Sequence, residues 1–240
     1  MSINHLTRAT RRMVAVVAVL MMTLVASSAA ADEERSSEEL SADELAERVQ
    51  HFYGQTEDFQ AAFLQSYTDV AAGQTKQSRG RVYFKKPGMM RWDYYDPSDD
   101  NRRDRVLVSD GSKFWIYEFE YQQVFRECLE DSQLPTTLRF LMGEGDLSEE
   151  FDIEVADEST RERPTIELTP KEPTSHYSKL RFELDGETFQ VTKTTVYDPY
   201  GNTNEIDFRN IRVNRNLSES SFEFEVPEGA RELNPQKQCD

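Results

Sequence analysis

After residue 73 the chain is a succession of short segments in which apolar and polar residues alternate, separated by tight turns. Asp110-Gly111 is a dipeptide typical of a tight hairpin turn, and Asp185-Gly186 and Asp198–Gly201 are further turn signals. Alternation with a period of two is the pattern of a half-buried strand. Consecutive hairpins indicate one antiparallel sheet, and a sheet of about ten or eleven strands curls toward a barrel.

The alternating segments define the strands that we expect. They occupy residues 79–85, 90–95, 105–109, 113–118, 122–126, 151–155, 165–169, 180–184, 189–197, 206–213 and 222–226. The apolar parity changes between Phe208 and Ile211, which predicts a β-bulge near Arg209-Asn210. Residues 59–70 leave two alternatives open, because Phe59, Phe63 and Tyr67 fit a helical spacing while the alternation from Phe63 fits a strand.

Two segments carry helix signals. Ser41 and Glu44 form a capping box, the stripe of Leu45, Val49 and Phe52 follows, and Gly54 ends the pattern. A second, short helix is predicted over 134–142, where a proline suits the first turn. The apolar side of that helix consists of Leu134, Leu138, Leu141 and Met142.

The N-terminus has the pattern of a secretory signal peptide. Arg8, Arg11 and Arg12 precede an uncharged apolar run, and Ala29–Ala31 provides a cleavage signal. We therefore predict a signal peptide over 1–31 and one domain over 32–240, exported through cleavage after Ala31. No cysteine lies near the cut, so a lipid-anchored N-terminus is not expected.

Charge limits the partners. The net charge is −17 at pH 7, and loss of the three signal-peptide arginines would take it to −20. Such a chain repels phosphate backbones, so we expect no nucleic-acid partner.

Cys128 and Cys239 are the only cysteines. An even number in an exported chain favours one disulfide, which would tie the C-terminal tail to the middle of the domain. Two free thiols are the alternative.

Signatures of catalysis are missing from the sequence. Only His51 and His176 lie outside the predicted signal peptide, and GxSxG, HExxH, P-loop and GxGxxG motifs are absent. We expect no enzyme activity, no metal site and no cofactor. A secreted enzyme working through acidic residues is an alternative without a nameable site.

Aromatic residues are abundant: 14 Phe, 10 Tyr and 2 Trp. Phe114-Trp115-Ile116-Tyr117 places bulky side chains at both parities of one strand. In a strand with one solvent-exposed face, apolar and polar residues should alternate. Because they do not alternate here, we expect both faces of this strand to be covered, one by a core or ligand and the other by a helix or loop.

Four motifs follow one another along the chain: Lys85-Lys86-Pro87 ending a strand, Arg91-Trp92 in the next strand, Ser109-Asp110-Gly111 followed by Trp115, and Pro135 preceding Leu141-Met142-Gly143. Together they resemble the periplasmic outer-membrane lipoprotein carrier family, LolA. The clear resemblance covers residues 59–155.

The resemblance implies an incomplete, curved antiparallel β-barrel whose short helices form a lid over a hydrophobic cavity for lipoprotein acyl chains. It implies a periplasmic, monomeric carrier that collects cargo from an inner-membrane ABC-type extractor and delivers it to an outer-membrane acceptor. In the family a basic residue before the proline latches the lid, a role that falls here on Lys86 or Arg91. The side chains expected to line the cavity are Phe63, Phe84, Met90, Trp92, Tyr94, Trp115, Leu138, Leu141 and Met142.

Fold does not fix function. A periplasmic lipid-binding protein or envelope-stress sensor on the same half-barrel is the main alternative.

Overall fold

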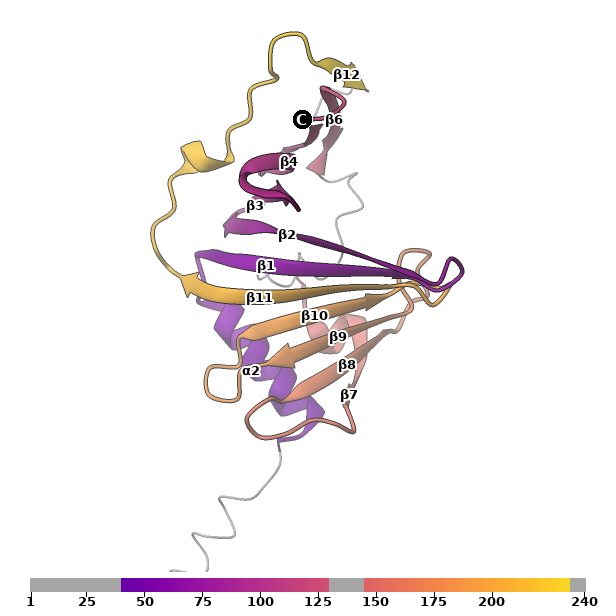
Figure 1. The fold of residues 1–240 in the computed structure, drawn as a ribbon. Coiled ribbons are helices and arrows are strands. Elements are labelled where there is room, and N and C mark those ends of the chain that lie inside the picture. The colour runs from indigo at the N-terminus through magenta and orange to yellow at the C-terminus, as the bar shows by residue number, and fades with distance from the viewer. Residues whose placement is uncertain (1–39, 130–144, 234–240) are drawn as a thin grey trace, which may run out of the picture. The chain divides into compact units, whose positions relative to one another are not determined.

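The computed structural model of the protein describes residues 40–129 and 145–233. Within these ranges one 12-stranded sheet has the order β12-β6-β5-β4-β3-β2-β1-β11-β10-β9-β8-β7. Neighbouring strands are antiparallel, except that β12 runs parallel to β6. The sheet curves and does not close, because β12 and β7 form its two ends (Figure 1). The predicted mainly β fold with an unclosed sheet is therefore confirmed.

The strands are connected mostly by hairpins, as the turn signals predicted. Their bounds are β1 Asp58–Asp69, β2 Gln74–Lys85, β3 Met89–Asp96, β4 Asp99–Asp110, β5 Lys113–Glu118, β6 Gln123–Cys128, β7 Phe151–Val155, β8 Thr165–Pro170, β9 Lys179–Leu184, β10 Val191–Tyr197, β11 Thr203–Val213 and β12 Arg231–Leu233. The described helices are α2 Ala42–Gly54, α4 Leu147–Glu150 and the 3-10 helix η2 Glu219–Phe222. In the described ranges, none has the length and apolar character needed to span a bilayer.

The ambiguous segment after residue 58 is a strand. It is β1, and it pairs with β2 and β11 in the middle of the sheet. The predicted bulge is confirmed: the β1–β11 register shifts between Gln60 and Ala62, opposite Arg212 and Arg209, and Asn210 has a positive φ of 53°.

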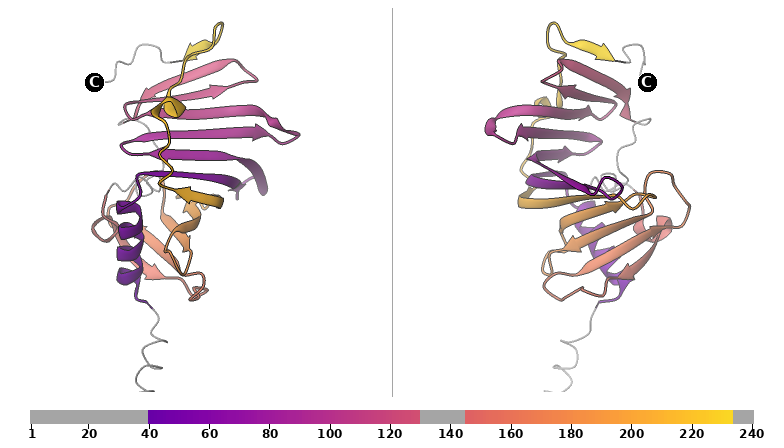
Figure 2. Two further views of the ribbon diagram at one scale, coloured as in Figure 1. Left: turned by 90° about the vertical axis from the view of Figure 1, so that its left-hand side faces the viewer. Right: turned by 45° about the vertical axis from the view of Figure 1, so that its right-hand side comes forward.

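Helix α2 begins as the sequence predicted. The Ser41 hydroxyl accepts from the backbone N–H of Glu44 (3.3 Å), and the Ser41 N–H donates to the Glu44 carboxylate (2.9 Å). The buried stripe differs at its end: it consists of Leu45, Ala46, Val49 and Tyr53, while Phe52 is half-buried. This stripe packs against β7 and β8 (Figure 2).

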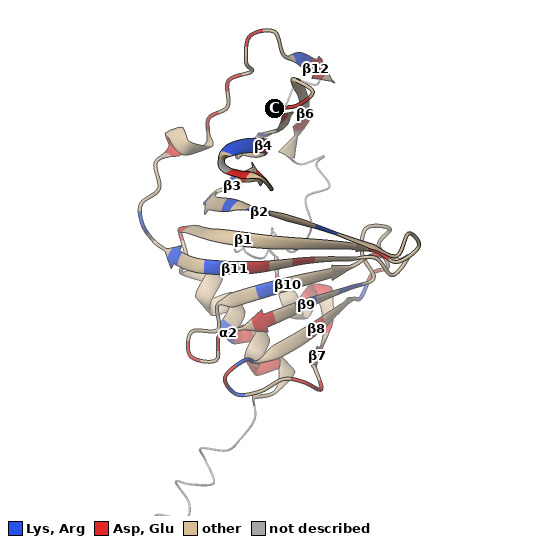
Figure 3. Cartoon of the chain, in the orientation of Figure 1, with Lys and Arg blue, Asp and Glu red and all other residues tan. Residues whose placement is uncertain are grey.

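The two faces of the sheet differ in chemistry. Residues directly opposite each other in a ladder share a face, and this defines an inner face that carries Phe63, Trp92 and Phe182 and is covered by α2 on β7 and β8. The outer face carries ion pairs on β8 to β11, and Figure 3 shows basic and acidic positions along these strands. In these pairs Arg181 and Lys179 contact Glu167, and Lys193 contacts Glu183 and Glu205.

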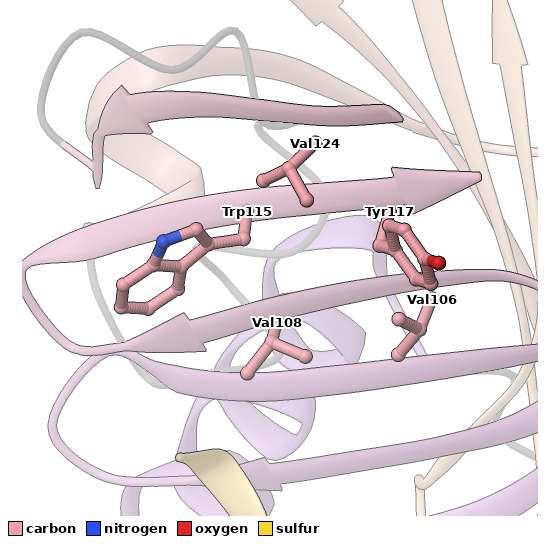
Figure 4. Close-up of a cluster of buried hydrophobic side chains, with 5 residues drawn as sticks. All are labelled: Val106, Val108, Trp115, Tyr117 and Val124. Atoms are coloured by element: carbon pink, nitrogen blue, oxygen red, sulfur yellow. The ribbon is translucent and has the colours of Figure 1, made fainter. Parts of the chain in front are cut away.

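The outer face becomes apolar over β4, β5 and β6. There a buried cluster forms from Val106, Val108, Trp115, Tyr117 and Val124 (Figure 4). The C-terminal segment after β11 crosses this face, and Phe224 packs on Trp115 and Tyr117 with ring centroids 5.9 and 6.1 Å apart (Figure 2). Both faces of β5 are thus apolar, which explains the missing alternation.

The predicted strand over 222–226 is wrong. Residues 219–222 form η2, the next residues are extended without a strand partner, and the last strand is β12, farther along the chain. The alternation of Phe222 and Phe224 arises because an extended segment that crosses a sheet also turns every second side chain toward it.

Two predictions involve residues outside the described ranges. The helix over 134–142 lies there entirely. Cys128 is buried and disulfide-bonded, but Cys239, the only other cysteine, is not described. The Cys128–Cys239 pairing stays a prediction.

Replacing Phe224 with Ala should weaken the cover over Trp115. We expect a loss of about 2–3 kcal/mol in the free energy of unfolding, from apolar area and aromatic contact, and a red shift of tryptophan emission. Urea unfolding followed by fluorescence measures both. Tyr200→Ala is the control, because Tyr200 is 87% exposed; equal effects of the two changes would contradict the packing described.

The candidate functional site, an apolar inner face

Six aromatic residues from four adjacent strands lie together on the inner face. This aromatic cluster consists of Phe59, Phe63, Phe84, Trp92, Tyr94 and Phe208. Phe63 is central, with ring centroids 4.9 Å from Trp92 and 5.0 Å from Tyr94, both edge-to-face. Edge-to-face contacts are favourable for aromatic rings, so the cluster forms a cohesive apolar surface.

Gly80 makes room for the cluster. It lies opposite both Phe63 and Tyr94 in the ladder. A Cβ atom at this position would stand 2.7 Å from the Phe63 ring and 2.0 Å from the Asp93 carbonyl oxygen. A side chain here cannot be accommodated without displacing Phe63, so the glycine is needed for this close approach.

The apolar inner face continues beyond the cluster to β6. Trp92 is opposite Leu107, Leu107 is opposite Ile116, and Ile116 is opposite Phe125. Leu107, Ile116 and Phe125, here called the apolar row, are only half-buried. The apolar row is therefore a part of this face on which apolar side chains are partly exposed.

Polar groups border the aromatic cluster at one end. The Arg105 guanidinium lies 4.3 Å from the centroid of the Tyr94 ring, a cation–π arrangement. Burial raises the pKa of Tyr94, so its hydroxyl stays protonated. Within the described ranges, no group of three or more His, Cys, Asp or Glu side chains is placed to hold a metal ion.

Most of the described residues predicted to line the cavity do lie together. Phe63, Phe84, Met90, Trp92 and Tyr94 are all buried on the inner face.

Trp115 does not join them. It is opposite Val108, which is opposite Arg91, and so it belongs to the outer face under Phe224. The placement of Trp115 in the cavity is corrected accordingly. Leu138, Leu141 and Met142 lie outside the described residues.

Sequence reasoning missed several members of this face. Phe59 and Phe208 belong to the aromatic cluster, and the apolar row was not singled out. The spacing of Phe59 and Phe63 could have predicted that Phe59 belongs to the cluster, because side chains an even number of residues apart lie on the same face of a strand.

Lys86 attaches helix α2 to the turn after β2. Its ammonium donates to the carbonyl oxygens of Tyr53 (2.8 Å) and Gly54 (3.3 Å), at the end of the helix. The last carbonyls of a helix lack partners within the helix, and a cation is favourable at this negative end. The Lys86 backbone N–H also donates to Glu57 (3.0 Å).

Arg91 holds a different element. Its Nε donates to Asp93 (3.1 Å) and its Nη1 to the Ser221 carbonyl (3.3 Å), so it joins β3 to the C-terminal segment on the outer face. Of the two basic residues considered for a latch, Lys86 contacts α2, whereas Arg91 contacts Asp93 and Ser221.

Helix α2 has a second attachment at Tyr53. The Tyr53 hydroxyl accepts from the backbone N–H of Val191 (3.2 Å), and burial raises the pKa of this phenol far above its usual range. The hydroxyl therefore remains protonated, and α2 is fixed to the sheet from both β2 and β10.

An open antiparallel sheet with an apolar inner face partly covered by a helix defines a class of proteins suited to apolar ligands. The family model described as "Outer membrane lipoprotein carrier protein LolA" matches residues 54–225. The chain belongs to the LolA family.

Relatives named "Outer-membrane lipoprotein carrier protein" are similar over most of their length. One from Methylococcus capsulatus is 30% identical over 183 residues, which cover 76% of this chain and 84% of the relative. One from Chromohalobacter salexigens is 28% identical over 186 residues, or 77% and 84% of the two chains. The crystal structure of a conserved protein from Thermus thermophilus superposes with a TM-score of 0.50 at 12% identity, covering 80% of this chain and 98% of that one. That last likeness shows the fold alone.

Lys86→Met should loosen the C-terminal end of α2, because it removes two hydrogen bonds and a favourable charge while keeping side-chain length. A cation at a partly buried helix end contributes about 1–2 kcal/mol, so hydrogen exchange of the last α2 amides should become about 5- to 30-fold faster. Lys86→Arg should preserve slow exchange. Unchanged exchange in Lys86→Met would show that Lys86 does not hold the helix.

Proposed function

We propose that this chain is a periplasmic carrier that binds the acyl chains of lipoproteins on its inner face and moves them toward the outer membrane. Membership of the LolA family over residues 54–225 is the observation that carries the proposal. The aromatic cluster and the apolar row supply a surface suited to acyl chains.

The energetics agree with such a task. A methylene group removed from water is worth about 0.8 kcal/mol, so an acyl chain of roughly 15 methylenes costs about 12 kcal/mol to expose. A carrier must cover most of this surface and still release it. Aromatic and methionine side chains such as Trp92 and Met90 adapt to irregular chains, which favours reversible binding.

Partners and location follow from the same proposal. Residues 1–31 would direct export and be removed, leaving residues 32–240 as a single monomeric domain in the periplasm. Acylated lipoproteins would be the cargo, an inner-membrane ABC-type extractor the donor, and an outer-membrane protein or lipid site the acceptor. Binding and release require no catalytic residue.

Contacts of α2 support a role for Lys86 in controlling access. The helix covers the inner face over β7 and β8, and Lys86 joins its end to the turn between β2 and β3, the strands that carry Phe84 and Met90. A change at Lys86 would therefore alter how α2 is attached to β2, a strand that carries part of the aromatic cluster.

The test is release of a radiolabelled lipoprotein from spheroplasts into a soluble complex with the purified protein. Wild-type protein should release it in an ATP-dependent way. Ile116→Glu places a carboxylate in the half-buried apolar row, where contact with acyl chains is unfavourable, and should lower release about tenfold or more. Val155→Glu is the matched control, because Val155 is 42% exposed on the edge strand β7.

Two results would contradict the proposal. One is the absence of release by wild-type protein together with a failure to bind a hydrophobic fluorescent probe. The other is an equal loss of release in the Ile116 and Val155 variants.

A further inference from the structure

The two covers of the sheet, helix α2 on the inner face and the C-terminal segment on the outer face, meet at one end of β1. Helix α2 ends at Gly54, a few residues before β1, and the C-terminal segment begins after Val213, the last residue of β11 (Figure 1). In the ladder, Val213 is opposite Phe59, the second residue of β1. Both covers therefore leave the sheet at the same place.

Lys85 and Lys86, which are adjacent in the chain, hold one cover each. The Lys86 ammonium donates to carbonyl oxygens at the end of α2, as described above. The Lys85 ammonium donates to the carbonyl oxygen of Leu217 in the C-terminal segment (2.7 Å) and lies 3.7 Å from the Glu219 carboxylate. The end of β2 is thus attached to both covers.

Asp58, at the start of β1, fixes the beginning of the C-terminal segment. Asp58 is buried, and its carboxylate accepts from the backbone N–H groups of Arg215 (2.7 Å) and Leu217 (3.2 Å). Its backbone carbonyl accepts from the N–H of Asn214 (2.9 Å). A buried carboxylate is costly without such donors, so the segment is held here by groups that β1 itself needs to pair.

Asn214 joins the C-terminal segment to the end of α2. Its Oδ1 accepts from the backbone N–H of Glu57 (2.8 Å), and its Nδ2 donates to the carbonyl oxygen of Gln55 (3.3 Å), the residue directly after the helix. A backbone N–H needs an acceptor and a carbonyl needs a donor, so the two partners fix the orientation of the side-chain amide. One side chain of the outer cover therefore contacts the connection between α2 and β1.

The backbone of Asn214 has a conformation that favours asparagine. Its φ of 54° lies in the left-handed region, where asparagine is enriched several-fold among residues other than glycine. Asn216 has a nearly equal φ of 57°, and its side chain is exposed. Within residues 40–129 and 145–233, no hydrogen bond of the Asn216 side chain is present. The two asparagines thus share a backbone conformation and differ in their side-chain contacts.

We propose that Asn214 couples the two covers, so that release of the end of α2 also loosens the C-terminal segment. Hydrogen bonds join the end of α2, the start of β1, the end of β2 and the start of the segment into one contiguous network, and such networks carry energetic coupling. The coupling is reciprocal, because each cover changes the free energy of the other by the same amount.

For a carrier, this coupling would transmit the state of the inner face to the outer face. An acyl chain that moves α2 would loosen the packing of Phe224 on Trp115 and Tyr117. That consequence rests on the proposed function. The coupling itself does not, and its test contains no acyl chain, so failure of lipoprotein release and failure of the coupling are separate results.

The experiment is hydrogen exchange of single backbone amides in the full chain, measured by NMR. Lys86→Met releases the end of α2, and the C-terminal segment is observed at the amides of Arg215 and Leu217, which donate to Asp58. We expect Lys86→Met to speed exchange at these two amides about threefold or more, since hydrogen bonds of the network are weakened. In an Asn214→Gly background, Lys86→Met should not speed them further.

The variants separate the side chain from the backbone. Glycine keeps the left-handed conformation and removes only the side-chain bonds. Asn216→Gly is the matched control, and in that background Lys86→Met should speed exchange as it does in the wild type. Asn214→Asp is a second variant, because its carboxylate still accepts from Glu57 but cannot donate to Gln55, and it should also abolish the transmitted effect. Thermal unfolding of each variant verifies that the fold is intact.

Reciprocity gives a second measurement in the opposite direction. Lys85→Met releases the C-terminal segment and should speed exchange of the last α2 amides, provided that Asn214 is present. The proposal is overturned if Lys86→Met leaves the Arg215 and Leu217 amides unchanged, or speeds them equally with and without the Asn214 side chain. It is also overturned if Asn216→Gly removes the transmitted effect as completely as Asn214→Gly.

Discussion

Alternation of side chains along each strand is the constraint on which the structure depends. A single open sheet has two faces, and every apolar residue must be turned toward a cover. Here the inner face is apolar from the aromatic cluster to Leu180 and Phe182 on β9, while the outer face of β8 to β11 carries ion pairs. A register shift of one residue would turn the apolar side chains of a strand to the other face. The bulge between the pairs Gln60–Arg212 and Ala62–Arg209 therefore keeps the two apolar patterns of β11 on one face.

Different elements cover the apolar surface in different parts of the sheet. Helix α2 covers the inner face over β7 and β8 and is attached through Tyr53 and Lys86. The C-terminal segment covers the outer face over β4 to β6 and is attached through Arg91 and Phe224. With α2 at one end and the C-terminal segment on the other face, the apolar row remains partly accessible.

Signals confined to a few residues predicted their structures well. The capping box at Ser41, the Asp-Gly turns and the parity change near Arg209 depend on local backbone geometry, and each is present as predicted. The sequence could not decide whether the segment that forms β1 is a strand or a helix. Aromatic residues four positions apart lie on the same face of a strand and on nearly the same face of a helix.

The wrong predictions depended on which distant segment packs on which face of the sheet. Trp115 lies in a strand that is apolar at both parities, so nothing local assigns it to a face; the long-range contact with Phe224 does. The same contact explains why residues 222–226 imitate a strand.

The two tryptophans lie on opposite faces, and this permits a direct test of where acyl chains bind. Single-tryptophan proteins, Trp115→Phe and Trp92→Phe, would be titrated with a fatty acid brominated along its chain, because bromine quenches tryptophan emission at contact. Binding on the inner face predicts strong quenching of Trp92 and little quenching of Trp115. Quenching of Trp115 alone, or equal quenching of both, would contradict it.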